Sequence, residues 1–313
     1  MAPDLVLVGT YYDWDIEALE REFTLHILDP SDAPDTLNEA VREKVRFLSL
    51  KGHAPLGGDY MDAFPNLEVI ANFGVGYDAI DVAAATARNI RVTNTQDVLD
   101  DDVADTAVLL LLSQLKGAFG AERWVRDGFW PDGDYPLQRK MTGGHVGILG
   151  LGRIGRAIAD RLAAFDMQIS YFSRGPKDVP DGWSFFSTPE ALAEAVDFMV
   201  VITVGGPETE GLVSREVMKA LGPRGVLVNI SRGSVVDETA LLDLLESGEL
   251  GGAALDVFWG EPNVNSRFMA LDNVVLYPHI GSATEETRRE MGRVVRENLT
   301  AARTGAPLLT QVN

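Results

Sequence analysis

The segment that most constrains the fold is 150–155, which reads Gly-Leu-Gly-Arg-Ile-Gly directly after the apolar run 145–149. A helix-like segment, 153–165, follows it. In a strand–turn–helix unit the first glycine permits the tight turn, the second lets a pyrophosphate approach the backbone, and the third lets helix and strand pack closely. The helix N-terminus adds free N–H groups and a positive dipole end. The pattern is short, but its flanking elements favour a dinucleotide site at Gly150, Gly152, Arg153, Ile154 and Gly155.

The second strand of this unit, expected over 168–172, leads into a basic turn that contains Ser173, Arg174 and Lys177. A domain that binds NAD usually places Asp or Glu here to accept hydrogen bonds from the ribose 2′-hydroxyl. A carboxylate would repel a 2′-phosphate, whereas a hydroxyl, a guanidinium and an ammonium would bind one. The turn therefore predicts NADP(H) in preference to NAD(H). The alternative is that Arg174 and Lys177 are ordinary solvated loop charges.

Composition limits the class of protein and its partners. The 313 residues suffice for two domains, and the formal net charge of −20 argues against nucleic acid and anionic membranes as partners. The chain has no cysteine, so it forms no disulfide and has no thiolate chemistry, and we assign no metal ligands. No apolar run reaches the roughly 18 residues of a membrane span, and the N-terminus lacks the basic start of a signal peptide. We expect a cytoplasmic protein.

Short apolar runs alternate with helix-like segments along the chain, which is typical of parallel sheets with helices on both faces. The expected strands form two series. The first series is 5–9, 25–28, 45–50, 67–73 and 91–93, and the second is 145–149, 168–172, 198–203, 225–230, 252–257 and 274–277.

These two series predict an α/β fold with two doubly wound parallel-sheet domains, a flavodoxin-like substrate domain and a Rossmann coenzyme domain, with a cleft between them. A long helix over about 101–128, deeply buried along 103–115, would join the domains. The last helix, about 285–303, would pack back on the first domain and make it discontinuous. The expected ranges are 1–97 with 286–313 for the substrate domain and 98–285 for the NAD(P)-binding domain.

Ligands of doubly wound domains bind outside the carboxyl ends of the strands. In the second series, Arg232 follows the fourth strand, Glu261 the fifth and His279 the sixth. Reduction of a 2-keto acid requires a fixed cation for the carboxylate and for charge that develops on the carbonyl oxygen, and Arg232 can serve both. His279 is the candidate general acid, and Glu261 would fix its tautomer and favour the imidazolium. We predict that these three residues are catalytic.

A single histidine near a strand end is more often a structural hydrogen-bonding residue than a catalytic one. Three of the four histidines, His26, His53 and His145, are therefore interpreted as structural or incidental. His279 differs because Arg232 and Glu261 are expected at the same edge of the sheet.

Several segments together resemble the D-isomer-specific 2-hydroxyacid dehydrogenases, and most of all their NADPH-dependent glyoxylate/hydroxypyruvate reductase branch. The likeness extends over nearly the whole chain. It is carried by 150–155, by Asn-Ile-Ser-Arg-Gly at 229–233, by Ala-Leu-Asp-Val-Phe at 254–258 with Glu261-Pro262, by Pro-His-Ile-Gly-Ser-Ala-Thr at 278–284, and, for the branch, by 125–130, 171–174 and 308–312.

The resemblance implies further roles. The family's Arg–Glu–His triad falls on Arg232, Glu261 and His279, and its carboxylate-binding loop falls on 72–78, where Val75 and Gly76 would present backbone N–H groups. A glycine-rich turn after a strand can bind an anion in any case, although from the residues alone it reads as a simple turn. The resemblance and its motifs imply cofactor contacts at Thr106, Thr209, Ile230, Asp256 and Gly281, and substrate contacts at Val75, Gly76, Arg232, His279, Ser282 and Trp130 of the partner subunit. Members of the family are commonly homodimers.

One segment departs from the family pattern. Where the family usually reads Pro-Leu-Thr, this chain has Val-Gly-Gly-Pro-Glu-Thr at 204–209. The extra glycines leave the cofactor contact of Thr209 in doubt.

The expected activity is NADPH-dependent reduction of small 2-keto acids, glyoxylate and hydroxypyruvate, to glycolate and D-glycerate. The same chemistry on another 2-keto acid, such as 2-ketogluconate or phenylpyruvate, stays open because the residues lining the pocket cannot be sized from sequence. An alternative of another class is a nucleotide-sensing scaffold without turnover, which the intact Arg232, Glu261 and His279 set argues against.

Overall fold

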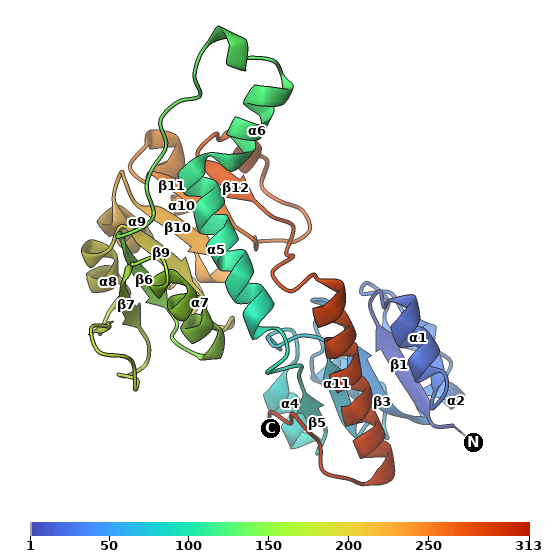
Figure 1. Ribbon diagram of the computed structural model, residues 1–313. Coiled ribbons are helices and arrows are strands. Elements are labelled where there is room, and N and C mark those ends of the chain that lie inside the picture. Colours follow the sequence, from blue (N-terminus) through green and yellow to red (C-terminus); the bar gives the residue numbers. More distant parts are fainter. Residues whose placement is uncertain (1) are drawn as a thin grey trace. The chain divides into compact units, whose positions relative to one another are not determined.

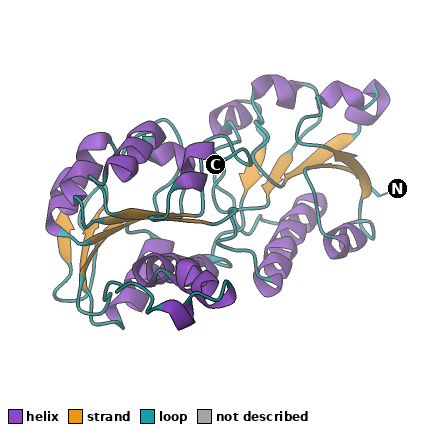
Figure 2. Cartoon of the chain, turned by 90° about the horizontal axis from the view of Figure 1, so that it is seen from above, coloured by secondary structure: helices purple, strands orange, loops and turns teal. Residues whose placement is uncertain are grey.

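The computed structural model describes residues 2–313, which form two compact units. One unit contains the chain up to Leu99 together with Ala283–Asn313, and the other is Asp100–Ser282. Each unit has its own parallel sheet, and helices cover both faces of each sheet (Figure 2). The two-domain α/β fold expected from the sequence is confirmed. The ranges 1–97 with 286–313 and 98–285 stay a prediction of the functional domains.

The first unit is built on a five-stranded sheet with the order β2-β1-β3-β4-β5, in which every neighbouring pair is parallel. This is the flavodoxin-like order, with its switch point between β1 and β3. The strands are β1 (Asp4–Val8), β2 (Thr24–Leu28), β3 (Val45–Leu50), β4 (Val69–Asn72) and β5 (Arg91–Thr93). The helices are α1 (Asp13–Leu19), α2 (Glu39–Arg42), α3 (Gly58–Asp62), α4 (Val82–Ala87) and α11 (Glu285–Thr304), with a 3₁₀ turn η1 (Pro34–Thr36).

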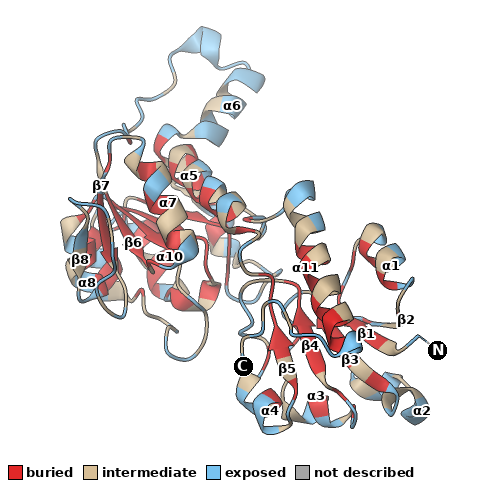
Figure 3. Cartoon of the chain, turned by 60° about the horizontal axis from the view of Figure 1, so that its bottom comes forward, coloured by how far each residue is buried: buried red, intermediate tan, exposed pale blue. Residues whose placement is uncertain are grey.

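The central strands of this sheet are buried on both faces, as the red segments of Figure 3 show. All four residues of β4 are buried, and so are five of the six in β3. A parallel sheet covered on both sides requires such near-continuous apolar runs. Helix α11, drawn in red in Figure 1, packs against β4 and α1. The C-terminal segment therefore belongs to the N-terminal sheet.

The second unit holds a seven-stranded parallel sheet with the order β12-β11-β10-β9-β6-β7-β8. The chain reverses its direction across the sheet between β6 and β9, as in a Rossmann domain. The strands are β6 (His145–Leu149), β7 (Gln168–Phe172), β8 (Ser184–Phe186), β9 (Phe198–Val201), β10 (Val226–Asn229), β11 (Gly252–Leu255) and β12 (Val274–Leu276). The helices are α5 (Asp100–Lys116), α6 (Ala118–Arg126), α7 (Arg153–Ala163), α8 (Pro189–Ala195), α9 (Arg215–Leu221) and α10 (Glu238–Ser247), with 3₁₀ turns η2 (Trp130–Asp132), η3 (Gly233–Val235) and η4 (Ser266–Ala270).

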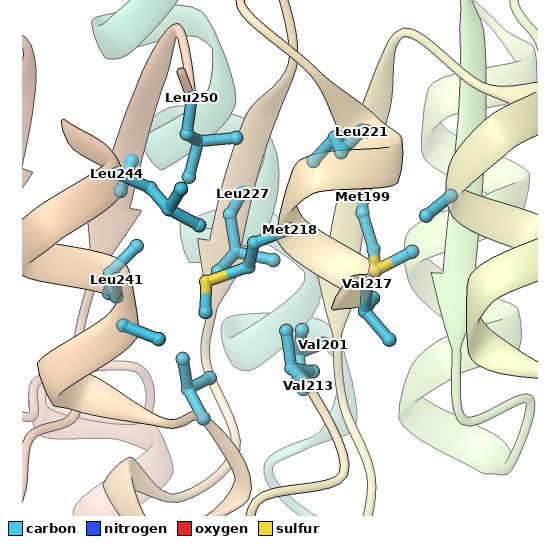
Figure 4. Packing of buried hydrophobic residues seen from close by; sticks show 14 of the residues in the cluster. Met199, Val201, Val213, Val217, Met218, Leu221, Leu227, Leu241, Leu244 and Leu250 are labelled. Atoms are coloured by element: carbon cyan, nitrogen blue, oxygen red, sulfur yellow. The ribbon is translucent and has the colours of Figure 1, made fainter. Parts of the chain in front are cut away.

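One face of this sheet carries a core made by α8, α9 and α10. Figure 4 shows Val217 and Met218 packed near Leu227 and Val201 of the sheet, and Leu241 close by. These side chains are at most 2% exposed. Burying a side chain of this size stabilises the fold by about 1.5–3 kcal/mol, so this face holds the strand ends in fixed positions.

The expected single helix over 101–128 is wrong, because α5 and α6 are separate. Gly117 adopts a left-handed conformation with φ of +56° between them, and the two axes differ by 59°. A residue without Cβ adopts this conformation at little cost, so the helix breaks there although the apolar pattern continues. Beyond the break, α6 has no buried residue, and it is drawn in pale blue and tan in Figure 3.

Among residues 2–313, no single helix is long and apolar enough to cross a membrane. The bent pair of α5 and α6 passes that test together, by length and composition only.

Several strands end earlier than the sequence suggests. Ile230, Asp256 and Tyr277 each donate one more ladder hydrogen bond to the neighbouring strand, after which the backbone turns away from the sheet. The residues expected at the ends of these strands therefore belong to the loops that carry the candidate site.

Candidate active site

The loop after β10 places Arg232. The Asn229 side chain organises this loop, because its Oδ1 accepts hydrogen bonds from the Ser231 N–H and hydroxyl while its Nδ2 donates to the Arg232 carbonyl at 2.9 Å. The Arg232 guanidinium is half-buried and donates to the Ser231 carbonyl at 2.7 Å. The cation is thus held close to its own backbone at the end of the strand.

Gly233 brings this loop against the loop after β11. A Cβ at Gly233 would lie 2.0 Å from the carbonyl carbon of Phe258, so only glycine fits there. The Glu261 carboxylate bridges its own loop and the next one, since Oε1 accepts the Phe258 N–H at 2.8 Å while Oε2 lies 2.6 Å from His279 Nδ1. The Glu261 carboxylate is therefore held in place by a backbone N–H group as well as by the histidine.

His279 follows β12 and has a left-handed backbone, with φ of +54°. Asp256, at the end of β11, holds this turn: its carbonyl accepts the His279 N–H, and its carboxylate accepts the N–H groups of Ile280 and Gly281, each at 2.8 Å. Burial raises the pKa of Asp256, although both backbone donors oppose that effect. The hydroxyl of Thr106 on α5 donates to the Gly281 carbonyl at 3.3 Å and ties the same turn to α5.

The structure thus places the three predicted catalytic residues at the carboxyl ends of β10, β11 and β12, which are neighbours in the sheet. With Nδ1 of His279 held by a carboxylate, Nε2 is the nitrogen positioned for proton exchange with a ligand. Carboxylate, imidazole and guanidinium are the groups needed for acid–base chemistry on a carbonyl beside an anion.

The turn between β6 and α7 fits the phosphates of a dinucleotide. A Cβ at Gly150 would lie 2.3 Å from the Ile202 carbonyl oxygen, and one at Gly155 would lie 2.1 Å from the Gly150 carbonyl oxygen. Both positions therefore require glycine, because the backbone segments pack too closely for a larger side chain. A Cβ at Gly152 would meet nothing within 4 Å, so its backbone is open to a ligand. No side chain caps the start of α7, which leaves its first-turn amides for an anion. Arg153 pairs with Asp100 at 3.1 Å, and Ile154 is half-buried.

At the tip of β7, Arg174 and Lys177 are exposed, and neither forms an ion pair within residues 2–313. The Ser173 hydroxyl donates to the Gly175 carbonyl at 2.6 Å, and the Lys177 N–H donates to the buried Tyr171 hydroxyl at 2.9 Å. The turn is therefore ordered by local hydrogen bonds while both cations reach solvent.

Two further residues, Ile230 and Thr209, were predicted to contact the cofactor. Ile230 is 6% exposed, and its side chain lies next to Gly281. Thr209 closes the glycine-containing loop on itself, since its hydroxyl donates to the Val204 carbonyl at 2.7 Å and contacts the Gly206 carbonyl at 3.2 Å. The role of Thr209 toward a cofactor stays a prediction.

In the first unit, the loop after β4 is held by Asn72. Its Nδ2 donates to the carbonyls of Gly74 and Gly76 at 2.8 and 2.9 Å, and Asn94 donates to the Val75 carbonyl at 3.1 Å. The loop carbonyls are thus engaged, whereas the N–H groups of Val75 and Gly76 donate to no other group in the described part of the chain. That arrangement suits an anion. Asn72 was not predicted, although an asparagine directly before a glycine turn is a signal for such a role.

Two further residues were predicted to contact the substrate, and three histidines were predicted to be structural or incidental. Trp130 in η2 is 63% exposed, and Ser282 is half-buried at the end of the second unit. His26 contacts Asp4 at 2.7 Å, His145 contacts Ser170 at 2.8 Å with its pKa lowered by burial, and His53 is exposed. Sequence reasoning missed the supporting residue Asn229, although it lies inside a quoted motif.

Comparison with known proteins agrees with this geometry. Residues 108–281 match the model of the D-isomer specific 2-hydroxyacid dehydrogenase NAD binding domain. Hydroxyphenylpyruvate reductase of Plectranthus scutellarioides is 46% identical over 305 residues, which is 97% of this chain and 96% of that protein. The 2-ketogluconate reductase of Gluconobacter oxydans is 41% identical over 311 residues, 99% of this chain and 98% of that protein.

A solved structure is similarly close. The NADPH-dependent glyoxylate/hydroxypyruvate reductase of Sinorhizobium meliloti, in complex with NADP and malonate, is 43% identical, with a TM-score of 0.95 over 100% of this chain and 97% of that one. Fold, site and comparisons together define an oxidoreductase with a Rossmann coenzyme domain. The chain belongs to the D-isomer specific 2-hydroxyacid dehydrogenases.

Proposed function

We propose that this protein reduces small 2-keto acids, glyoxylate and hydroxypyruvate, to glycolate and D-glycerate, with NADPH as the preferred cofactor. The observation that carries the proposal is the 2.6 Å contact between His279 Nδ1 and the Glu261 carboxylate, at the strand end next to that of Arg232. A glyoxylate/hydroxypyruvate reductase among the solved structures, 43% identical, supports the choice of substrate.

The residues divide the work as follows. The Gly150–Gly155 turn would hold the nicotinamide cofactor, which would supply the hydride. His279 gives a proton from Nε2 to the carbonyl oxygen of the substrate, and Glu261 holds the ring and stabilises its positive charge. Arg232 binds the substrate carboxylate and stabilises the charge that develops on the carbonyl oxygen. Thr106 and Asp256 keep the His279 turn in place through the Gly281 hydrogen bonds.

The preference for NADPH rests on Arg174 and Lys177. Both are exposed at the tip of β7. In domains that bind NAD, an acidic residue at this place accepts a hydrogen bond from the ribose 2′-hydroxyl. Two cations there can pair with a 2′-phosphate, and no carboxylate follows β7 directly to repel it. A reduced NADP pool in cells would favour reduction as the working direction.

The same chemistry on a larger keto acid is the second candidate. Relatives 46% and 41% identical are named for hydroxyphenylpyruvate and 2-ketogluconate, so an aromatic or polyhydroxy keto acid is a reasonable alternative substrate. We also propose a homodimer in which Trp130 of the partner subunit reaches the substrate, because Trp130 and Phe129 are exposed large apolar residues.

The test is a panel of glyoxylate, hydroxypyruvate, 2-ketogluconate, phenylpyruvate and 4-hydroxyphenylpyruvate, run with NADPH and with NADH. We expect the highest kcat/KM for glyoxylate or hydroxypyruvate with NADPH. A higher kcat/KM for one of the larger acids would replace the substrate assignment. An equal value with NADH would contradict the cofactor preference.

A further inference from the structure

Lys51 stands at the carboxyl edge of the first sheet, directly after β3. Its N–H donates to the Val8 carbonyl at 2.9 Å, next to the end of β1. Gly9 makes this approach possible, because a Cβ on Gly9 would lie 2.0 Å from the Lys51 carbonyl oxygen. The backbone of Lys51 is therefore fixed at the edge where ligands of doubly wound domains bind.

Three aromatic rings surround the ammonium group of Lys51. Its Nζ lies 3.6 Å from the ring centre of Tyr12, 5.1 Å from that of Phe73 and 5.7 Å from that of Tyr11. Tyr11 and Phe73 are buried and meet edge to face. Cation–π attraction of this kind holds a cation at a defined point while removing much of its water.

A second cation accompanies Lys51. Arg288, on α11, lies close enough to act electrostatically on Lys51, and its Nε is buried with no hydrogen-bond partner. Neither Lys51 nor Arg288 forms an ion pair within residues 2–313. In a chain with a net charge of −20, two adjacent cations without a carboxylate bound to either point to a ligand that carries oxygen or negative charge.

The loop that follows β4 indicates the chemical class of this ligand. Phe73 packs against Lys51 and immediately precedes the Gly74–Gly76 turn, where the N–H groups of Val75 and Gly76 suit a carboxylate. We propose that Lys51, with Arg288 beside it, is a specificity-determining residue that binds the oxygen-bearing end of the 2-keto acid, namely a hydroxyl or carboxylate beyond the keto carbon. This inference rests on the proposed function.

The charge of Lys51 is sensitive to pH near neutrality. Burial, and then the charge of Arg288, lower its pKa to about 8, while Asp15 on α1 acts in the opposite direction. The tyrosine beside it, Tyr11, stays a neutral phenol because burial raises its pKa. The ammonium form therefore predominates at pH 7 and is lost as the pH rises through about 8.

The first experiment compares four acids that differ only beyond the keto carbon: glyoxylate (hydrogen), pyruvate (methyl), hydroxypyruvate (hydroxymethyl) and oxaloacetate (carboxymethyl). In Lys51→Met, we expect kcat/KM for hydroxypyruvate and oxaloacetate to fall about tenfold relative to pyruvate, as the loss of a hydrogen bond to a charged group predicts. The value for glyoxylate should stay within about twofold, since glyoxylate has no group to reach Lys51. Lys51→Arg should keep most of the preference.

Lys44→Met is the matched control, because Lys44 is exposed and lies at the opposite end of β3. It should leave all four values unchanged. Equal losses for all four acids in Lys51→Met would show a merely structural role and overturn the inference, as would unchanged ratios. Wild-type protein that reduces none of the acids would contradict the proposed function itself, and the inference with it.

A second measurement needs no variant. In the wild type, the ratio of kcat/KM for oxaloacetate to that for pyruvate should fall several-fold between pH 7 and pH 9, as the Lys51 ammonium with a pKa of about 8 is lost. Any titration common to both substrates, including that of the general acid, cancels in this ratio. A ratio that stays constant over this range would also overturn the inference.

Discussion

The Glu261 carboxylate is held by its own loop and orients the imidazole of His279. One Glu261 oxygen accepts the Phe258 N–H at 2.8 Å, and the other lies 2.6 Å from His279 Nδ1. The carboxylate is thus immobilised by its own loop and in turn orients the imidazole. His279 itself has a left-handed backbone that Asp256 maintains through three hydrogen bonds.

Replacement of His279 by alanine should remove the proposed general acid. A positioned acid contributes about 10²–10⁴-fold to the rate, so kcat should fall by that factor while cofactor binding persists. Stopped-flow or steady-state oxidation of NADPH at 340 nm measures kcat, and fluorescence titration measures the affinity for NADPH. A variant with wild-type kcat would refute the acid assignment.

Glu261→Gln keeps the size of the side chain but loses its charge. The hydrogen bond to a charged partner is worth about 1.5–3 kcal/mol, so we expect kcat to fall about 10–100-fold, less than in His279→Ala. The double variant should be no worse than His279→Ala alone, because both changes act through the same imidazole. Additive losses would show that Glu261 acts independently of His279.

The Gly150–Gly155 turn allows stability and cofactor binding to be separated. A Cβ at Gly155 would lie 2.1 Å from the Gly150 carbonyl oxygen, so Gly155→Ala should destabilise the fold by about 1–3 kcal/mol. A Cβ at Gly152 would meet no protein atom within 4 Å, so Gly152→Ala should change stability by less than about 0.5 kcal/mol. It should nevertheless weaken NADPH binding, because the methyl group would occupy the space proposed for the pyrophosphate.

Denaturant unfolding and NADPH titration of both variants check this contrast. Wild-type affinity in Gly152→Ala would mean that the phosphates do not pass over Gly152. Wild-type stability in Gly155→Ala would mean that α7 can shift away from β6.

The parts of the fold that depend on local sequence patterns could be predicted from the sequence, whereas those that depend on contacts between distant residues could not. Strands such as β3 and β6 were predicted at their observed bounds, since buried parallel strands are mostly apolar runs. Strand β8 was missed, because it has three residues at the sheet edge and none is buried. The helix break at Gly117 was missed because the apolar pattern continues across it.

The candidate site likewise contains residues that the sequence predicts and supporting contacts that it does not. Arg232, Glu261 and His279 could be predicted to lie at one edge of the sheet because each follows a strand, and parallel strands end at the same edge. The supporting contacts of Asn229 and Asp256 depend on loop backbone that no periodicity describes. Lys51 could not be found from spacing, because its neighbours Tyr12, Phe73 and Arg288 meet only in the folded sheet.

The proposed preference for NADPH gives a further prediction. Arg174→Ala should lower the ratio of kcat/KM with NADPH to that with NADH by about tenfold or more, since one charge-assisted hydrogen bond to the 2′-phosphate is lost. The loss should appear in KM for NADPH and leave NADH values near wild type. Arg21→Ala, at an exposed position of the first unit, is the control for a general change of charge. An unchanged ratio would indicate that Arg174 is only a solvated loop charge.

Asp15 provides a prediction for stability against pH. Its side chain is 2% exposed, and both carboxylate oxygens lack a hydrogen-bond partner, although Arg296 Nη1 lies 3.6 Å from Oδ1. Burial raises the pKa of Asp15 above 3.8, and the charges of Arg296 and Lys51 only partly oppose this. The folded state therefore binds this proton more tightly than the unfolded state. The stability that Asp15 contributes is present below pH 3.8 and is lost as pH rises through the folded-state pKa.

Asp15→Asn has no proton to lose, so its free energy of unfolding should increase relative to the wild type as pH is raised from about 4 to 7. Urea unfolding at intervals across this range measures the difference between the two proteins, in which the titration of all other groups largely cancels. Asp13→Asn, exposed on the same helix, should show no such trend. If the free energy of unfolding of Asp15→Asn instead falls relative to the wild type toward pH 7, the charges of Arg296 and Lys51 outweigh burial. The Asp15 carboxylate would then stabilise the fold.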